Sequence, residues 1–402
     1  MDVEPFQLLV KPASDRCNAA CSYCFYRGTG ASVGSGCLTP PEVLEATVTK
    51  YLRLGFRVNS FIWQGGEPTV AGLAFFRDAV ALQAARGSRG QVVANAFQTN
   101  GRLLDDRWAA FFANYRFFLG VSVDGNPRVN DAARGVGAHA AAVRAVRCLR
   151  RAGVEYNLLA VLHRRNAAAI VQSYQHLKTL GRHVQFIPAF QFGGDGKPTD
   201  ESVDPRRYGR ALLAVFDAWR RGDVGRTFLR TFDAVLNAFV GVPPGSCTFG
   251  PSCAPYLVVE ANGDVFPCDF FVAPKWRLGN VLTDDLAALA RRRREEFAAL
   301  KAATSPRCRT CTWLPLCHGG CLKDRPPGPS WPRVPSAFCE AYRSFFEATF
   351  HWFAELSVRV ARARSLPFPR FLSTLDPSRE CPCGSGLTLE RCAAGPVVRR
   401  VG

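Results

Sequence analysis

The 402-residue sequence has no long apolar stretch and no beginning that is typical of exported proteins. No segment reaches the ~18 consecutive apolar residues that a membrane-spanning helix needs, which excludes an integral membrane protein. The first residues, Met1 to Lys11, lack both the basic start and the apolar core of a signal peptide. We therefore expect a cytoplasmic protein with no membrane partner.

Acidic residues are scarce, with 33 Asp and Glu against 51 Lys and Arg, and the formal net charge is +18. Such a balance can attract acidic partners, including nucleic acids. The charge is scattered, however, and its densest block, Arg291 to Arg294, lies in a helical stretch rich in Ala, Leu and Glu. No helix-turn-helix, RNA-recognition or basic-arm pattern accompanies it. A solvated helix face is the simpler interpretation, and we expect no nucleic-acid partner.

Cysteine, in contrast, is abundant, with sixteen residues. The cytosol keeps thiols reduced, so they favour metal or cluster ligation over disulfides. Cys17, Cys21 and Cys24 follow the apolar run Phe6 to Val10, which predicts a first strand. Three thiolates hold three corners of a cubane and leave the fourth iron open to a small molecule, which favours a catalytic centre. A zinc knuckle or unrelated buried thiols are the alternative.

The CxxxCxxC spacing, with the aromatic Tyr23 before the third cysteine, resembles the radical S-adenosylmethionine (SAM) enzymes. The longer string KPASDRCNAACSYCFYR, from Lys11 to Arg27, resembles their anaerobic sulfatase-maturating branch. The resemblance implies an open [4Fe-4S] cluster on the three cysteines, and SAM bound beside it with Tyr23 in the cofactor site.

The first 240 residues alternate short apolar runs with longer amphipathic ones, as in parallel βα units. The predicted strands are Phe6 to Val10, Asn59 to Trp63, Val93 to Gln98, Phe117 to Val123, Asn157 to Leu162 and Val184 to Ile187. Helical patterns between them include Pro41 to Leu54 and Ala71 to Arg86. The pattern alone fits a doubly wound sheet equally well. The resemblance implies an α/β fold built on a partial (β/α)6 radical SAM barrel.

Polar residues follow the predicted strands, where parallel α/β folds place their sites. After the second strand, Gly65 and Gly66 let the backbone approach a ligand closely, while Glu67 and Pro68 fix the turn. An ordinary turn is the alternative. The resemblance implies that this segment holds the amino group of SAM.

Further positions are candidate SAM contacts. The third strand ends at Asn100, and the fourth at Ser122 and Asp124, with side chains suited to ribose hydroxyls and a carboxylate. Arg134 could meet the SAM carboxylate or form a surface salt bridge. The resemblance makes Ile187 an adenine contact, although a core residue is the simpler interpretation.

A second set of cysteines begins beyond Gly241, where Val-Pro-Pro-Gly-Ser breaks a helical pattern over Leu229 to Val240. Its ordered spacing in a reduced compartment is hard to explain without metal. It resembles the SPASM extension, a cysteine-rich domain with two auxiliary cluster sites. The resemblance implies one closed [4Fe-4S] cluster on Cys247, Cys253, Cys268 and Cys321, and another on Cys308, Cys311, Cys317 and Cys339. Closed clusters suit electron transfer, and two structural zinc sites are the alternative.

Asp269 follows Cys268 directly, and Tyr26 lies two residues beyond Cys24. Aspartates near loops usually make turns. The resemblance implies instead that Asp269 is a catalytic base with Tyr26 as its partner, since a general base must be positioned and shielded to accept a proton.

The C-terminal part follows the proline-rich stretch Arg325 to Pro335 and an amphipathic, aromatic run from Ala337 to Arg364 that predicts a helix. Cys381, Cys383 and Cys392 in the tail resemble the SEC-C zinc motif, but Ala393 occupies the position of its fourth ligand. Zinc binding there is left open. The predicted domains are a barrel over 1–240, a SPASM domain over 241–345, a helical segment with linker over 346–375 and a tail over 376–402.

The resemblance implies a radical SAM oxidoreductase with three [4Fe-4S] clusters and SAM. Reductive cleavage of SAM would give a 5′-deoxyadenosyl radical that takes a hydrogen from the β-carbon of Cys or Ser in an unfolded sulfatase peptide. Asp269 would take the side-chain proton and the auxiliary clusters the second electron, which yields Cα-formylglycine. A flavodoxin- or ferredoxin-like protein would donate the first electron.

Two other functions stay open from the sequence. One is a radical SAM maturase of a ribosomally made peptide, which forms thioether crosslinks or epimerised residues. The other is a non-catalytic metal-binding adaptor.

Overall fold

The computed structural model describes residues 3–27, 36–378, 380 and 386–394. They fold into two compact units that interleave along the chain. The first unit takes its residues from Met1–Gln191, Pro198–Val203 and Pro255–Ala299, and the second from Phe192–Lys197, Asp204–Ala254 and Leu300–Gly402. None of the helices in the described ranges has the length and apolar character needed to cross a membrane.

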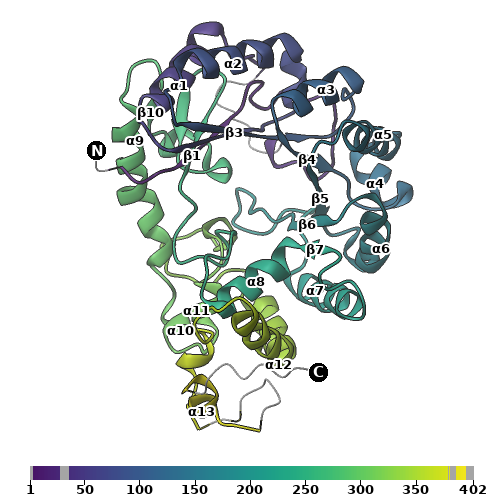
Figure 1. Cartoon of the computed structure of the whole chain (residues 1–402), viewed down its shortest axis with the longest axis vertical. Coiled ribbons are helices and arrows are strands. Elements are labelled where there is room, and N and C mark those ends of the chain that lie inside the picture. The colour runs from purple at the N-terminus through teal and green to yellow at the C-terminus, as the bar shows by residue number, and fades with distance from the viewer. Residues whose placement is uncertain (1–2, 28–35, 379, 381–385, 395–402) are drawn as a thin grey trace. The chain divides into compact units, whose positions relative to one another are not determined.

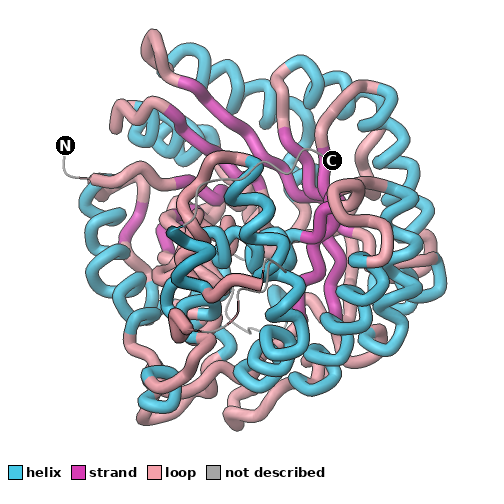
Figure 2. Tube along the Cα trace, turned by 60° about the horizontal axis from the view of Figure 1, so that its bottom comes forward, coloured by secondary structure: helices cyan, strands magenta, loops and turns pink. Residues whose placement is uncertain are grey.

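Six parallel strands form the centre of the first unit (Figures 1 and 2). They are β1 (Gln7–Val10), β2 (Val58–Trp63), β3 (Val92–Thr99), β4 (Phe118–Ser122), β5 (Tyr156–Leu162) and β6 (His183–Pro188). Each pairs in parallel with the next along the chain. A doubly wound sheet reverses its strand order at a switch point, and these six strands do not. All six predicted strands are confirmed, and the order is that of a partial barrel.

Three short strands extend the sheet beyond β1. They are β8 (Tyr256–Val259), parallel to β1, then β9 (Asp264–Phe266) and β10 (Gly279–Asn280), each antiparallel to its neighbour. The sequence analysis missed all three, because runs of two to four residues give too little periodicity to recognise. Cys268 and Asp269 lie just after β9, so these strands place both residues near the edge of the sheet.

Helices follow the parallel strands and cover the outer face of the sheet (Figure 1). They are α1 (Pro41–Leu52), α2 (Gly72–Arg86), α3 (Asp106–Asn114), α4 (Pro127–Arg134), α5 (Ala138–Arg151) and α6 (Ile170–Leu180), with α9 (Leu286–Arg292) later in the chain. Local signals mark their starts: Pro41 is the first residue of α1, and the Asp105 carboxylate accepts the N–H groups of Arg107 and Trp108 at the start of α3. The helices predicted from Pro41 and Ala71 are confirmed.

Aromatic side chains fill the space between the sheet and its outer helices. Phe76 of α2 is fully buried, and its ring meets the rings of Trp63, Phe97 and Trp108 at centroid distances of 5.0–5.6 Å. Edge-to-face contacts of this kind stabilise a core beyond the area they bury. The rigid layer fixes where β2 and β3 end, and those ends carry candidate site residues.

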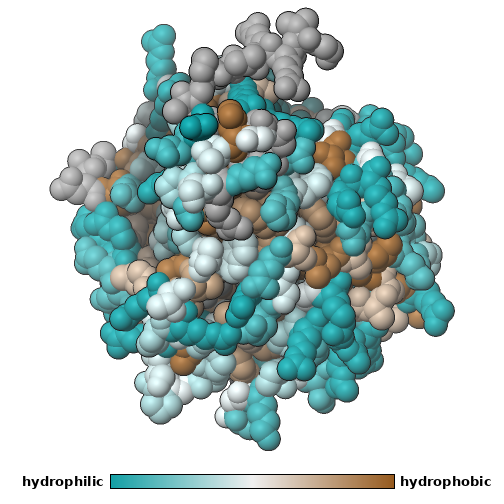
Figure 3. Space-filling model, turned by 90° about the horizontal axis from the view of Figure 1, so that it is seen from below, coloured by the Kyte–Doolittle hydropathy of each residue, from teal (hydrophilic) through white to brown (hydrophobic). Residues whose placement is uncertain are grey.

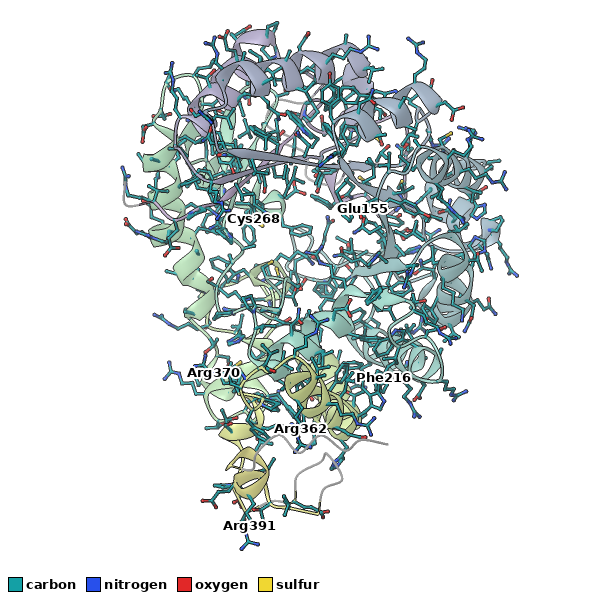
Figure 4. The ribbon with its side chains drawn as sticks, in the orientation of Figure 1. Glu155, Phe216, Cys268, Arg362, Arg370 and Arg391 are labelled. Carbon is teal, nitrogen blue, oxygen red and sulfur yellow. The ribbon has the colours of Figure 1, made fainter. Side chains whose placement is uncertain are left out.

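The second unit is built on helices α7 (Pro205–Arg220), α8 (Arg230–Val240) and α12 (Cys339–Ala363), and α12 packs on both of the others. Phe216 of α7, labelled in Figure 4, lies among aromatic rings, and Phe232 stacks on Phe345 at 5.6 Å. Smaller elements are β7 (Phe228–Leu229), α10 (Pro306–Arg309), α11 (Leu314–Cys317) and α13 (Leu389–Ala394). The helices predicted at Leu229 to Val240 and Ala337 to Arg364 are confirmed.

Hydrophilic residues cover most of the face seen in Figure 3, with apolar residues interspersed. Arg291 and Arg292 at the end of α9 and Arg294 just beyond it are exposed, as expected of a solvated helix face. Arg293 differs, since its side chain is buried and donates to the Pro267 carbonyl.

Replacing Phe76 by Ala should lower the free energy of unfolding by about 3–5 kcal/mol, because the cavity would open between three rings that cannot all close in on it. The control is Val136→Ala, whose side chain is 93% exposed and should change stability by less than about 0.5 kcal/mol. Urea unfolding followed by tryptophan fluorescence measures both. A loss in Phe76→Ala no larger than the control's would contradict the packing role.

Candidate active site

Cys17, Cys21 and Cys24 lie on one loop between β1 and a short 3-10 turn, Phe25–Arg27. Cys17 is exposed, and the other two are half-buried. The Cys17 sulfur accepts the Ala19 N–H at 3.4 Å. Three thiols on one exposed loop fit a cluster with one iron left open.

The Gly65-Gly66 segment is pressed against this loop. The Gly66 N–H donates to the Ser14 carbonyl at 2.7 Å, and the Glu67 N–H to the Arg16 carbonyl at 2.9 Å. A Cβ at Gly65 would lie 2.7 Å from the Ser14 oxygen, and one at Gly66 only 2.2 Å from the Arg16 oxygen. Only glycine fits at either position. The Gly66 amide thus bonds within the chain, and the SAM contact of this segment stays a prediction.

Glu67 is almost fully buried and joins the ends of β2 and β3. Its carboxylate accepts the Thr69 N–H and hydroxyl, the Thr99 hydroxyl at 2.8 Å and the Asn100 N–H at 2.7 Å. Burial raises the pKa of Glu67, and these donors oppose the rise. The Asn100 side chain then reaches the Cys17 sulfur at 3.7 Å. Two predicted cofactor residues are thereby brought to the cluster loop.

Asp124, Arg134 and Tyr23 form a second connection to that loop. Arg134 Nε and Nη2 lie 2.9 and 3.0 Å from the two Asp124 oxygens, and the Tyr23 hydroxyl donates to Asp124 at 2.6 Å. Burial lowers the pKa of Arg134, but the charge of Asp124, its hydrogen bond and the neighbouring Tyr23 together raise it more, so the net shift is upward. Burial also raises the pKa of Tyr23 far above its usual value. The ion pair is buried rather than on the surface, and the predicted SAM contacts of all three stay predictions.

The remaining candidate SAM contacts lie on strands. Ser122 is the last residue of β4 and is buried. Ile187 lies on β6, half-buried and in register with Val161 of β5. Both roles stay predictions.

Asp269 lies just after β9 and is nearly buried, among polar side chains from the ends of β1 and β2 and from the turn Phe25–Arg27. The Tyr26 hydroxyl donates to both carboxylate oxygens, at 3.0 and 2.9 Å. Gln64 Nε2 donates to Oδ2 at 2.9 Å, and Lys11 Nζ lies 2.7 Å from Oδ1. The structure therefore brings together the predicted pair of Asp269 and Tyr26. Figure 4 labels the adjacent Cys268.

Lys11 is a buried cation between two carboxylates. Its Nζ lies 2.7 Å from Glu260 as well as from Asp269, and Ser14 donates to the second Glu260 oxygen. Burial lowers the pKa of Lys11, yet the two acidic neighbours raise it more. Lys11 therefore stays charged, and its ammonium group lies directly against the Asp269 carboxyl group.

Sequence reasoning missed Lys11, Gln64 and Glu260 as site residues. Each follows a strand directly: β1, β2 and β8 respectively. That position at the carboxyl end of a parallel strand was the available signal for Lys11 and Gln64. Glu260 gave none, because β8 itself was not recognised.

Four predicted cluster ligands of the second unit line one cavity of about 330 Å³. Cys308, Cys311, Cys317 and Cys339 reach it from α10, α11, α12 and the turns between them. The aromatic side chains of Trp313, Tyr342 and Phe346 complete its walls. Burial raises the pKa of the Cys317 thiol to about 11. A cavity lined by four thiols fits a closed iron–sulfur site.

The other predicted set divides between the units, with Cys268 in the first and Cys247, Cys253 and Cys321 in the second, so it stays a prediction. Within the described residues, no three His, Cys, Asp or Glu side chains converge closely enough to hold a single metal ion. Cys381 and Cys383 lie outside the described residues, as does the Cys392 side chain. Of the two unassigned cysteines, Cys148 is buried and Cys37 is exposed.

Comparisons with known proteins agree with this geometry. Residues 12–177 match the radical SAM superfamily, and residues 247–312 match an iron-sulfur cluster-binding domain, SPASM. A cysteine-type anaerobic sulfatase-maturating enzyme of Clostridium perfringens is 33% identical over 358 residues, 86% of this chain and 96% of the relative. A serine-type enzyme of Bacteroides thetaiotaomicron is 32% identical over 80% of this chain and 84% of the relative.

Solved structures give the same result. Native anSMEcpe with bound AdoMet and Cp18Cys peptide superposes with a TM-score of 0.82 at 33% identity, over 88% of this chain and 99% of that one. Streptococcus suis SuiB, at 15% identity and a TM-score of 0.59, covers 83% of this chain and 77% of its own, and shares the fold alone.

The fold and the three-cysteine loop define a radical SAM oxidoreductase with an iron–sulfur cluster-binding SPASM domain. Within that class, the chain belongs to the family of anaerobic sulfatase-maturating enzymes. Iron–sulfur clusters and SAM are therefore its cofactors.

Gly66→Ala should displace the cluster loop, because the added Cβ would overlap the Arg16 carbonyl. After anaerobic reconstitution we expect about four fewer iron atoms per chain, one cubane, and no SAM cleavage. In the control, Gly222→Ala, the new methyl group meets no atom within 4 Å, and full iron content is expected. Wild-type iron and SAM cleavage in Gly66→Ala would show that the loop tolerates the displacement.

Proposed function

We propose that this enzyme oxidises a Cys or Ser in an unfolded sulfatase peptide to Cα-formylglycine under anaerobic conditions. The observation that carries the proposal is the nearly buried Asp269 carboxylate, held by Lys11, Tyr26 and Gln64 in the unit that also carries the three-cysteine loop. Identity of about one third to both cysteine- and serine-type enzymes supports the same reaction and leaves the choice of target residue open.

Each predicted ligand set has a proposed occupant. Cys17, Cys21 and Cys24 hold the open [4Fe-4S] cluster, and the eight later cysteines hold two closed ones. When bound, the open cluster and SAM supply a 5′-deoxyadenosyl radical able to take a hydrogen atom from the substrate β-carbon. Gly65, Glu67 and Asn100 orient SAM beside the loop, together with Ser122, Asp124 and Arg134.

Asp269 acts as the general base. The oxidation removes a hydrogen atom, a proton and an electron from the substrate, and Asp269 takes the proton from the thiol or hydroxyl group. A Ser substrate gives the aldehyde directly, whereas a Cys substrate gives a thioaldehyde that water hydrolyses to the aldehyde with release of hydrogen sulfide. A carboxylate has about four acceptor positions. Lys11 and Gln64 occupy one each, and Tyr26 is shared between the two oxygens. Displacement of Tyr26 from one oxygen leaves room for the substrate proton, while Lys11 keeps the carboxylate in place. The electron leaves toward the auxiliary sites.

The electron donor, the cellular location and the domain boundaries are part of the same proposal. A flavodoxin- or ferredoxin-like protein supplies the electron, and the enzyme works in the cytoplasm. The barrel spans 1–240 and the SPASM domain 241–345, followed by the helical segment over 346–375 and the tail over 376–402. Zinc bound by the tail would need a ligand from elsewhere, since Ala393 replaces the fourth.

Maturation of a ribosomally made peptide is the alternative reaction. The likeness to SuiB supports the fold alone at 15% identity. Identity of about one third to sulfatase-maturating enzymes favours formylglycine formation over this alternative.

Replacing Cys17, Cys21 and Cys24 together by Ala should remove about four iron atoms per chain and abolish SAM cleavage. The matched control is Cys37→Ala, an exposed cysteine outside every predicted ligand set, which should keep both. Iron analysis and chromatography of 5′-deoxyadenosine measure the two effects. Continued 5′-deoxyadenosine formation in the triple variant would exclude radical SAM chemistry at this loop.

Asp269→Asn should uncouple the reaction, because an amide of nearly the same size cannot take the proton. We expect SAM cleavage to continue while aldehyde formation falls about 10²–10⁴-fold, the usual contribution of a general base. Mass spectrometry of peptides with Cys-x-Pro-x-Arg or Ser-x-Pro-x-Arg, in the reactions that are also assayed for 5′-deoxyadenosine, measures both.

The control for this experiment is Asp264→Asn on β9, a buried carboxylate that pairs with Arg277 and lies outside the proposed site. It should form aldehyde as the wild type does. Aldehyde at wild-type yield in Asp269→Asn would remove Asp269 from the mechanism.

A further inference from the structure

Arg325 is a fully buried cation in the second unit, with 1% of its surface exposed. Its guanidinium donates only to backbone carbonyls, at 3.0 Å to Ala303, 2.8 Å to Pro332 and 2.9 Å to Lys301. Its Nε is buried and has no hydrogen-bond partner. Throughout the described part of the chain, no carboxylate pairs with Arg325.

Lys301 is a second cation of the same kind, also 1% exposed. Its Nζ donates to the carbonyl of Cys247, and to that of Thr248 at 3.3 Å. No ion pair joins it to an acidic side chain of residues 3–27, 36–378, 380 or 386–394. The described residues of the second unit therefore bury two positive charges without a protein counterion.

Two positive charges buried in this way need a negatively charged group nearby to balance them. A guanidinium stays protonated in proteins, and an unpaired buried charge is strongly destabilising. The acidic residue next to Arg325, Asp324, pairs with Lys323 instead. Glu340 and Glu347 pair with the exposed Arg307 and Arg343. The described acidic side chains of this region are thus engaged elsewhere.

The groups that face both cations are the predicted cluster ligands. A Cβ on Gly319, between Cys317 and Cys321, would lie 2.9 Å from Arg325 Nη2, so the guanidinium lies against that loop. Burial lowers the pKa of Arg325, and the thiols of Cys308, Cys321, Cys253 and Cys317 oppose this. Burial likewise lowers the pKa of Lys301, against Cys247, Cys253 and Cys321.

We propose that Arg325 and Lys301 are the built-in countercharges of the auxiliary clusters and raise their reduction potential. This inference rests on the auxiliary ligands proposed above. A cluster held by four thiolates is anionic, and its negative charge grows on reduction, so a fixed buried cation stabilises the reduced state more than the oxidised one. A raised potential suits clusters that accept the substrate electron.

The test compares auxiliary-cluster potentials in the full-length chain. All variants carry Ala at Cys17, Cys21 and Cys24, so that only auxiliary clusters contribute to the signal and catalysis is not needed. Arg325→Gln and Lys301→Met each remove one buried charge. Arg325→Lys keeps the charge, and Arg343→Gln removes one from the exposed rim of the Cys308 cavity. Electron paramagnetic resonance during an anaerobic redox titration gives the potentials, and iron and sulfide analysis gives occupancy.

Removal of either buried charge should lower a potential. We expect, at a given solution potential, about a tenfold change in the ratio of oxidised to reduced cluster, or about 59 mV for one electron. Arg325→Lys should stay near the parent value, and Arg343→Gln should too, since water screens a surface charge. If Arg325→Gln loses auxiliary iron, the potential measured in Lys301→Met alone tests the proposal.

Unchanged potentials in fully loaded Arg325→Gln and Lys301→Met would overturn the countercharge proposal and leave the ligand assignment intact. The countercharge proposal also fails if Arg325→Lys shifts the potential as far as Arg325→Gln does, because packing rather than charge would then be responsible. A parent protein without auxiliary iron would overturn the ligand assignment and this inference with it.

Discussion

The buried ion pair between Lys11 and Asp269 is the interaction on which the site of the first unit depends. Lys11 stands at the end of β1, and Asp269 and Glu260 stand after the short strands that extend the sheet beyond it. Lys11 Nζ lies 2.7 Å from both acidic side chains, so one buried positive charge faces two carboxyl groups. The same charge therefore joins the end of β1 to the residues that follow β8 and β9.

The cluster loop is held to this framework by shape as much as by charge. Gly65 and Gly66 allow the loop backbone to lie directly on the second strand end. Glu67 then ties that end to the end of β3 through two hydrogen bonds, from the Thr99 hydroxyl and the Asn100 N–H. Tyr23 of the cysteine motif reaches Asp124 after β4. Each of these strand ends thus helps to hold the loop, and a change at any of them would alter the positions of the three cysteines.

The six parallel strands and the cysteine loops were predictable because their signals are local: apolar runs of strand length and fixed spacings between thiols. Lys11 and Gln64 were not recognised, since a single polar residue after a strand looks ordinary until the sheet order brings strand ends together. Glu260 depended on β8, whose four residues give no usable periodicity. Asp269 was found through its family resemblance, and its partners Lys11 and Gln64 only through the fold.

Lys11 in the first unit and the pair Arg325 and Lys301 in the second are buried cations with different neighbours. In the first, Lys11 has two carboxylates, and its charge is balanced within the chain. In the second, Arg325 and Lys301 have backbone carbonyls, which stabilise a cation through dipoles but do not cancel its charge. A fold with two unbalanced cations beside cysteines becomes neutral only when something anionic binds there. The charge pattern therefore favours clusters over empty thiols in the second unit, and it makes the stability of that unit depend on their presence.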